Sequence, residues 1–216
     1  MDWFRGTIRA VRPVSLESNR ELLRKYIMSS EKEILVRAGE LYSGIWGHPD
    51  IEEAIKQRVD SVNFSFICGP YIDILDNVVI RLGTLSSLKL YRQEDRGGQH
   101  YRVFDDGSVF YFEDEHSPLS PGRNGLFVEG HPELGREFKS DHLNQILNSK
   151  LRLTTRENYL QNFIYVAPKP EGGLRVPSND EFVNLVQTVD QKGPPDVLIN
   201  RLIQDSKKAI ESDVSV

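Results

Sequence analysis

The chain has few of the features that mark secreted or membrane-spanning proteins. Its 216 residues include one cysteine, Cys68, so no internal disulfide can form. This composition suits a reducing compartment, and we expect a cytoplasmic protein. The opening residues 1–5 (MDWFR) do not form the apolar run of a signal peptide, and no window has the length of a transmembrane helix. The formal net charge of −5 argues against a broad electrostatic grip on DNA or on an anionic membrane, although a local basic pocket is compatible with it.

Several motifs of nucleotide binding, hydrolysis and metal binding are also missing. The sequence contains no P-loop, no G-x-S-x-G, no H-E-x-x-H and no paired C-x-x-C, and it shows no internal repeat. What is present is an apolar fraction of 38% with ten Phe and eight Tyr, which is enough for a core. A chain of this length forms one domain, or one domain with an appendage.

The first ninety residues alternate between strand and helix patterns. Apolar runs predict strands at 33–38, 62–66 and 88–91. Helical spacing of apolar residues predicts helices around 22–27, 51–59 and 75–82. Strands that alternate with helices are typical of an α/β fold with parallel strands.

After Arg92 the pattern changes to antiparallel strands. Residues 105–107 (Asp-Asp-Gly) give a strong hairpin signal between strands at 99–104 and 108–113. A further strand is expected at 125–129 and a helix at 132–149. The fold class predicted is therefore α/β, with a mixed sheet flanked by helices.

The C-terminal part is predicted to be a strand and helical extension. A strand is expected at 163–166, and Ser178 with Glu181 forms a capping box that starts a helix. A last helix is expected at 196–210. We divide the chain into a domain at 1–150 and an extension at 151–216.

Candidate functional residues gather on the predicted hairpin. His100 and Arg102 stand two positions apart on one strand, so their side chains share a face. Asp114 and His116 share a face on the next strand in the same way. An imidazole beside a guanidinium suits the gripping of, and attack on, a phosphate group.

These residues also carry a family resemblance. The phospholipase D superfamily has H-x-K, then an Asp after four intervening residues, and then G-S-x-N. Here H-x-R stands at 100–102, Asp106 lies one residue closer than the family's Asp, and residues 113–116 (EDEH) replace G-S-x-N. Residues 124–128 and 132–138 look like the family's closing strand and helix. The resemblance implies one half of a phospholipase D-type fold and a site that requires no metal and no cofactor.

Residue roles follow from the resemblance. It implies that His100 is the nucleophile, through a phosphohistidine, or the acid, and that Arg102 replaces the lysine that clamps phosphate. Asp114 takes the serine position and His116 the asparagine position. Apart from the resemblance, Arg96 belongs to a basic approach to His100 that either binds the phosphate of an anionic ligand or is a solvated loop, and the solvated loop is favoured. Because the chain carries one motif, the resemblance also implies a homodimer.

Two departures from the family pattern, Asp114 for the serine and His116 for the asparagine, weaken the case for catalysis. A carboxylate at Asp114 would face the bound phosphate, and like charges about 4 Å apart cost roughly 4 kcal/mol at an effective dielectric constant of about 20. Arg102 would have to neutralise Asp114, or Asp114 would have to orient His116 as the acid or base. Glu113 and Glu115 are expected on the opposite face, in solvent. A metal site of His100, Asp114 and His116 is disfavoured, because no further His or Cys completes it.

Two functions remain open. The favoured one is a non-catalytic homologue that binds a protein partner or a phosphate-bearing ligand as a homodimer. The alternative is a metal-independent phosphodiesterase that acts on nucleic acid or phospholipid with His100 as the nucleophile. Outside the hairpin, His48 is expected in a loop after the first strand, where pocket-lining residues of α/β proteins often lie.

Overall fold

A computed structural model gives the fold of the chain. It describes residues 8–39, 41, 43–75, 78–83, 85, 87–94, 99–113, 125–148, 151–189 and 195–213. The strands are β1 (Arg9–Val11), β2 (Glu33–Ala38), β3 (Asn63–Cys68), β4 (Tyr71–Asp73), β5 (Leu88–Arg92), β6 (Tyr101–Phe104), β7 (Val109–Glu113), β8 (Gly125–Glu129), β9 (Arg152–Thr154), β10 (Ile164–Pro168) and β11 (Leu174–Arg175). The helices are α1 (Leu16–Ser29), α2 (Ser43–Trp46), α3 (Pro49–Arg58), α4 (Val78–Gly83), α5 (Pro132–Asn148), α6 (Tyr159–Asn162), α7 (Asn179–Val189) and α8 (Asp196–Asp213).

The main sheet has eight strands in the order β1-β8-β7-β6-β2-β3-β5-β9. The strands β2, β3 and β5 run parallel, whereas the other neighbouring pairs are antiparallel. This mixed sheet confirms the α/β fold class predicted from the sequence. The hairpin β6–β7 lies next to β2, so Arg102 is carried on the central part of the sheet.

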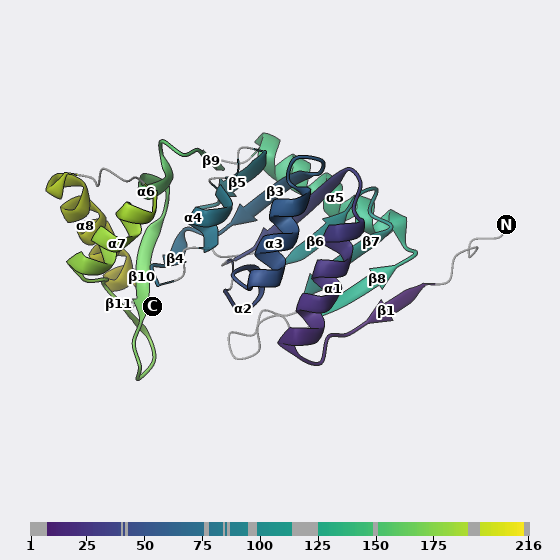
Figure 1. Cartoon of the computed structure of the whole chain (residues 1–216), viewed down its shortest axis with the longest axis horizontal. Coiled ribbons are helices and arrows are strands. Elements are labelled where there is room, and N and C mark those ends of the chain that lie inside the picture. Colours follow the sequence, from purple (N-terminus) through teal and green to yellow (C-terminus); the bar gives the residue numbers. More distant parts are fainter. Residues whose placement is uncertain are drawn as a thin grey trace.

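Helices cover both faces of the main sheet (Figure 1). The alternation along β2 shows how: Ile34 and Val36 belong to the large core beneath α1 and α3, whereas Leu35 belongs to a smaller core beneath α5. On β6, Phe104 faces the large core and Tyr101 and Val103 face α5. Residues of β6 with even numbers therefore point toward α1 and α3.

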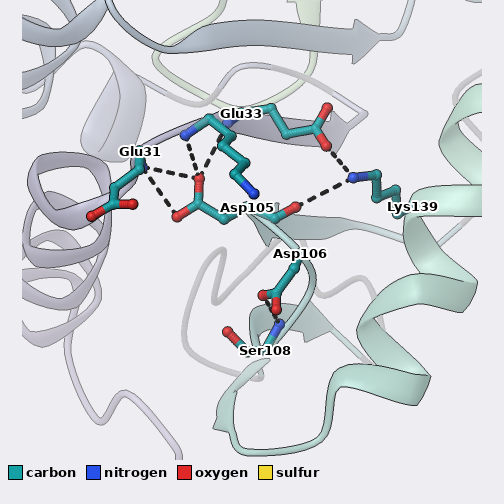
Figure 2. A network of polar contacts seen from close by, with 7 residues as sticks. Glu31, Glu33, Asp105, Asp106, Ser108 and Lys139 are labelled. Atoms are coloured by element: carbon teal, nitrogen blue, oxygen red, sulfur yellow. Dashed lines mark hydrogen bonds and ion pairs between the residues drawn. The ribbon is translucent and has the colours of Figure 1, made fainter.

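Polar contacts fix the tip of the β6–β7 hairpin against the start of β2 (Figure 2). Asp105 adopts a φ of 52°, and its Oδ1 accepts backbone N–H bonds from Glu31, Lys32 and Glu33 at 3.0, 2.7 and 3.2 Å. Lys139 of α5 forms an ion pair with Glu33 and also donates to the Asp105 carbonyl at 3.5 Å. Because three amides share one carboxylate oxygen, Asp105 holds the hairpin in register with β2.

The C-terminal residues extend the fold at the end opposite β1 (Figure 1). Strand β9 completes the main sheet, whereas β10 pairs in parallel with β4 and antiparallel with β11. The capping box predicted before α7 is present, because Glu181 N–H donates to Ser178 Oγ at 3.3 Å and Ser178 N–H donates to Glu181 Oε2 at 2.7 Å. Within the described part of the chain, no helix combines the length and apolar character needed to cross a membrane.

Candidate functional site

The hairpin register places His100 beside Glu113. Residues Phe104 and Val109 are paired, and so are Arg102 and Tyr111. One step further, Glu113 N–H donates to the His100 carbonyl at 3.0 Å. Side chains of directly opposed residues lie on the same face of a sheet. His100, Arg102, Tyr111 and Glu113 therefore form one group on the face that α1 and α2 cover.

Both ring nitrogens of His100 are engaged. Gly39 N–H donates to Nε2 at 2.8 Å, and Nδ1 lies 3.4 Å from Glu113 Oε2, while the side chain is 14% exposed. Because a backbone N–H only donates, Nε2 must be the unprotonated acceptor, and the ring proton then sits on Nδ1 toward Glu113. This arrangement fixes the tautomer and the orientation of the imidazole.

Arg102 is buried among aromatic rings. Its side chain donates through Nη1 to Asn19 Oδ1 of α1 at 2.6 Å, and the residue is 5% exposed. The guanidinium carbon lies 4.2 Å from the ring centre of Tyr111 and 5.2 Å from that of Trp46. Cation–π contacts of this kind strengthen when the cation is desolvated. Arg102 therefore stabilises the core instead of presenting its charge to solvent.

A buried carboxylate balances this cation. Burial raises the pKa of Glu113, but the hydrogen bonds from His100 and Tyr111 and the charge of Arg102 outweigh burial, so the pKa lies below its ordinary value. Tyr111 donates its hydroxyl to Glu113 Oε1 at 2.6 Å. Burial lowers the pKa of Arg102, while Tyr111 and Glu113 act in the opposite direction. The group is thus a compact network of paired charges under a helical cover.

The expectation for Glu113 was wrong. It was placed in solvent on the face opposite His100, but it lies beside His100 and is largely buried. The four-residue connection 105–108 pairs residue 104 with 109 and so brings an odd-numbered residue of β7 opposite an even-numbered residue of β6. Asp106, matched to the family's Asp, lies at the turn, where its Oδ1 accepts from Ser108 N–H at 3.0 Å. The contacts with the start of β2 are made instead by its neighbour Asp105, whose Oδ1 accepts from the N–H groups of Lys32 and Glu33.

Three residues predicted for the site lie outside the described residues: Asp114, His116 and Arg96. Glu115 does as well. Their proposed roles therefore stay predictions. Within the described ranges, no cluster of three or more His, Cys, Asp or Glu side chains has the arrangement of a metal site. His48, expected near a pocket, borders a small cavity of about 130 Å³ between the beginnings of α1 and α3.

Sequence reasoning missed four partners of the site, of which Tyr111 lies on the hairpin itself. Asn19 and Trp46 come from helices far from the hairpin in the chain, and Gly39 contributes only a backbone amide. The sequence held one usable signal for Asn19, which is a polar residue on the apolar side of the helix predicted there. The structure shows that Asn19 is completely buried. Gly39 gave no signal, since a backbone donor is independent of residue type.

Comparisons with known proteins give matches in structure but not in sequence. No protein-family model matches the chain, and no curated protein matches it. Among solved structures, a phospholipase D family member, Nuc from Salmonella typhimurium, is 15% identical over 70% of this chain and 99% of that one, with a TM-score of 0.49. NucT from Helicobacter pylori is 14% identical over 66% of this chain and 97% of that one, also with a TM-score of 0.49.

A third match is TrmBL2, described as an archaeal chromatin protein with a novel mode of DNA binding. It is 14% identical, with a TM-score of 0.47, and the match covers 65% of this chain and about half, 52%, of TrmBL2. Solved structures similar to this chain thus include one described as a phospholipase D family member. With identities of 14–15% and TM-scores below 0.5, these matches assign no activity, ligand or assembly to this chain.

Proposed function

We propose that this chain is a divergent phospholipase D-like domain that binds a partner and does not catalyse phosphodiester cleavage. The observation that carries the proposal is the bond from Gly39 N–H to His100 Nε2 at 2.8 Å. A nucleophile needs the lone pair of this nitrogen for phosphorus, and an acid needs a proton on it. Here the lone pair accepts from the backbone amide, and a proton on Nε2 would point at the N–H hydrogen.

Arg102 supports the same proposal. A phosphate clamp must bring its guanidinium to the ligand, but Arg102 is 5% exposed and bonded to Asn19. Moving it outward would leave the Asn19 oxygen and the Glu113 carboxylate without their cation, which costs free energy because both are buried. The polar groups of the motif therefore serve the stability of the fold. The net charge of −5 favours a protein partner over an extended polyanion. The proposal also covers a compact ligand that carries a phosphate group.

The alternative function is metal-independent phosphodiester cleavage with His100 as the nucleophile. One contact favours it: the Glu113 carboxylate lies 3.4 Å from His100 Nδ1, as carboxylates do that orient catalytic imidazoles. This contact is shared by both proposals, because it also satisfies a buried imidazole. The engagement of Nε2 is what separates them.

An activity assay with a stability measurement tests the proposal. Wild type and His100→Ala are compared on bis(p-nitrophenyl) phosphate and single-stranded DNA with EDTA present. We expect no hydrolysis above the blank by either protein. The substitution leaves Gly39 N–H without its acceptor and removes one of the contacts of Glu113, so the free energy of unfolding falls by about 1–3 kcal/mol.

The contradicting result is hydrolysis by wild type that disappears in His100→Asn while the urea unfolding midpoint stays unchanged. That outcome would make His100 a catalytic group and not a structural one. Nitrogen NMR of the imidazole gives a further check, because the proposal requires the tautomer with the proton on Nδ1.

We also propose that the chain forms a homodimer, in which the single motif of each chain has a counterpart. Light scattering on the purified protein should then give twice the chain mass of 24.7 kDa at micromolar concentration. A mass of one chain throughout the micromolar range would contradict the dimer and leave the binding role to a monomer. The division into residues 1–150 and 151–216 and the cytoplasmic location also stay predictions.

A further inference from the structure

A second cavity lies on the α5 face of the sheet, opposite His100. It has a volume of about 510 Å³ and is formed between α5 and the ends of β2, β6 and β7. Among its lining residues are Tyr101, Phe112, Phe138, Glu137, Asp141 and Arg37. This volume is in the range of pockets that take small molecules or side chains.

Aromatic rings form the wall of this cavity. The ring centre of Phe138 lies 5.2 Å from that of Tyr101 and 5.9 Å from that of Phe112. Tyr101 is 1% exposed and forms the floor, while Phe112 and Phe138 are half-buried. The faces of such rings carry negative potential and attract cations.

Two carboxylates and one guanidinium line the cavity beside the aromatic wall. Glu137 and Asp141 are one turn apart on α5 and both are exposed. Arg37 places Nη1 at 3.9 Å from Asp141 Oδ2, and its Nη2 donates to Gln93 Oε1 at 3.4 Å. Two carboxylates and one guanidinium give the lining a net charge of −1, which favours a cationic ligand.

Hydrogen bonds hold the floor of the cavity in place. The Tyr101 hydroxyl donates toward Asp141 Oδ2 at 3.3 Å and lies 3.3 Å from His142 Nδ1. The other ring nitrogen of His142 is 2.9 Å from Ser65 Oγ, and His142 is completely buried. Because Asp141 and Tyr101 are tied to this buried network, the site needs little ordering when a ligand binds.

We propose that this cleft binds the guanidinium group of an arginine in a polypeptide partner. A guanidinium is planar, so it can stack on Phe112 or Phe138 while its edge donates hydrogen bonds to a carboxylate. An ammonium ion lacks this shape. The cavity is also larger than the guanidinium alone and leaves room for the neighbouring peptide. Since the cleft and the His100 network lie on opposite faces of the sheet, this proposal does not depend on the proposed lack of catalysis.

Peptide titration followed by amide NMR of the full chain tests the proposal. The probes are acetyl-Gly-Arg-Gly-amide, the same peptide with lysine, and the same peptide with citrulline, which keeps the shape of arginine without its charge. We expect saturable shifts at α5 and β7 with the arginine peptide and binding weaker by about tenfold with lysine. The citrulline peptide should give no saturation in the millimolar range.

Matched substitutions on one helix give the control. Glu137→Gln and Asp141→Asn each remove one carboxylate from the lining and should weaken arginine binding by about tenfold. Glu133→Gln removes an exposed carboxylate of α5 that does not line the cavity and should leave binding unchanged. All three variants should keep the thermal unfolding midpoint of wild type within a few degrees.

Several outcomes would overturn the proposal: no saturation with the arginine peptide, equal binding of the citrulline peptide, or equal weakening by Glu133→Gln. Agmatine, a free guanidine, distinguishes the source of the ligand. If agmatine binds at the same site and more tightly than the peptide, the occupant is a small molecule, and the assignment to a polypeptide is wrong.

Discussion

Arg102→Ala should lower the free energy of unfolding by about 3–5 kcal/mol, the loss typical of breaking a buried charge pair. The substitution removes the donor to Asn19 and opens a cavity beside Trp46 and Tyr111. It also removes the cation that helps to lower the pKa of Glu113. Urea unfolding at neutral pH, followed by circular dichroism, measures the loss.

The matched control is Arg201→Ala, because Arg201 is 72% exposed and its contact with Asp205 lies on the helix surface. Exposed pairs contribute about 0–1 kcal/mol, so this variant should unfold near the wild-type midpoint. The double variant Arg102→Met, Glu113→Gln removes both charges. Its loss in free energy of unfolding should be smaller than the sum of the losses of Arg102→Met and Glu113→Gln measured separately. If Arg102→Ala were as mild as Arg201→Ala, the structural role of Arg102 would be wrong.

The order of elements was predictable because it follows from local sequence patterns. The alternation in Val62–Phe66 and the turn signal at 105–107 correspond to β3 and to the hairpin β6–β7. The start of α7 followed from Ser178 and Glu181, whose capping bonds span three residues. In each case the forces that decide the structure act within a few neighbouring residues.

The sequence predicted which side chains share a face of the sheet only for residues of the same strand segment. His100 directly precedes β6 and stands two residues before Arg102, and the two were correctly placed on one face, because the side-chain period of extended backbone is two. The step from β6 to β7 failed for Glu113, since the face of one strand relative to the next depends on the pairing register. That register is set by the four-residue connection 105–108, which pairs Phe104 with Val109.

The pairing of the hairpin with residues of other elements was not predicted. Asn19 and Arg102 are 83 residues apart, and Gly39 and His100 are 61 apart. Their contacts arise from the packing of α1 and the end of β2 against the hairpin. His142 was likewise given no role from the sequence, although it is completely buried against Ser65 and Tyr101.

His142 should make the protein lose stability in weak acid. Burial, with a smaller effect of the Arg37 charge, lowers its pKa from 6.5 to about 4. The unfolded chain therefore takes up a proton as the pH falls through 6.5, whereas the folded chain does so only near pH 4. Stability from the neutral imidazole is complete above about pH 6.5 and is lost between there and pH 4. Between pH 7 and pH 5 the expected loss is about 2 kcal/mol.

Comparison with His142→Gln isolates this contribution. The lowered pKa values of Glu52, Glu113 and Glu129 affect stability mainly below about pH 4.5, where their unfolded forms begin to take up protons. Glutamine keeps a polar group near Ser65 but does not titrate, so its urea midpoint should change less than that of wild type from pH 7 to pH 5. Parallel pH profiles for the two proteins, or an NMR titration of His142 near pH 6.5, would contradict the assignment. A steeper profile in wild type would establish that His142 is held neutral by its burial between α5 and the sheet, where the hydroxyl groups of Ser65 and Tyr101 bring no negative charge to its ring.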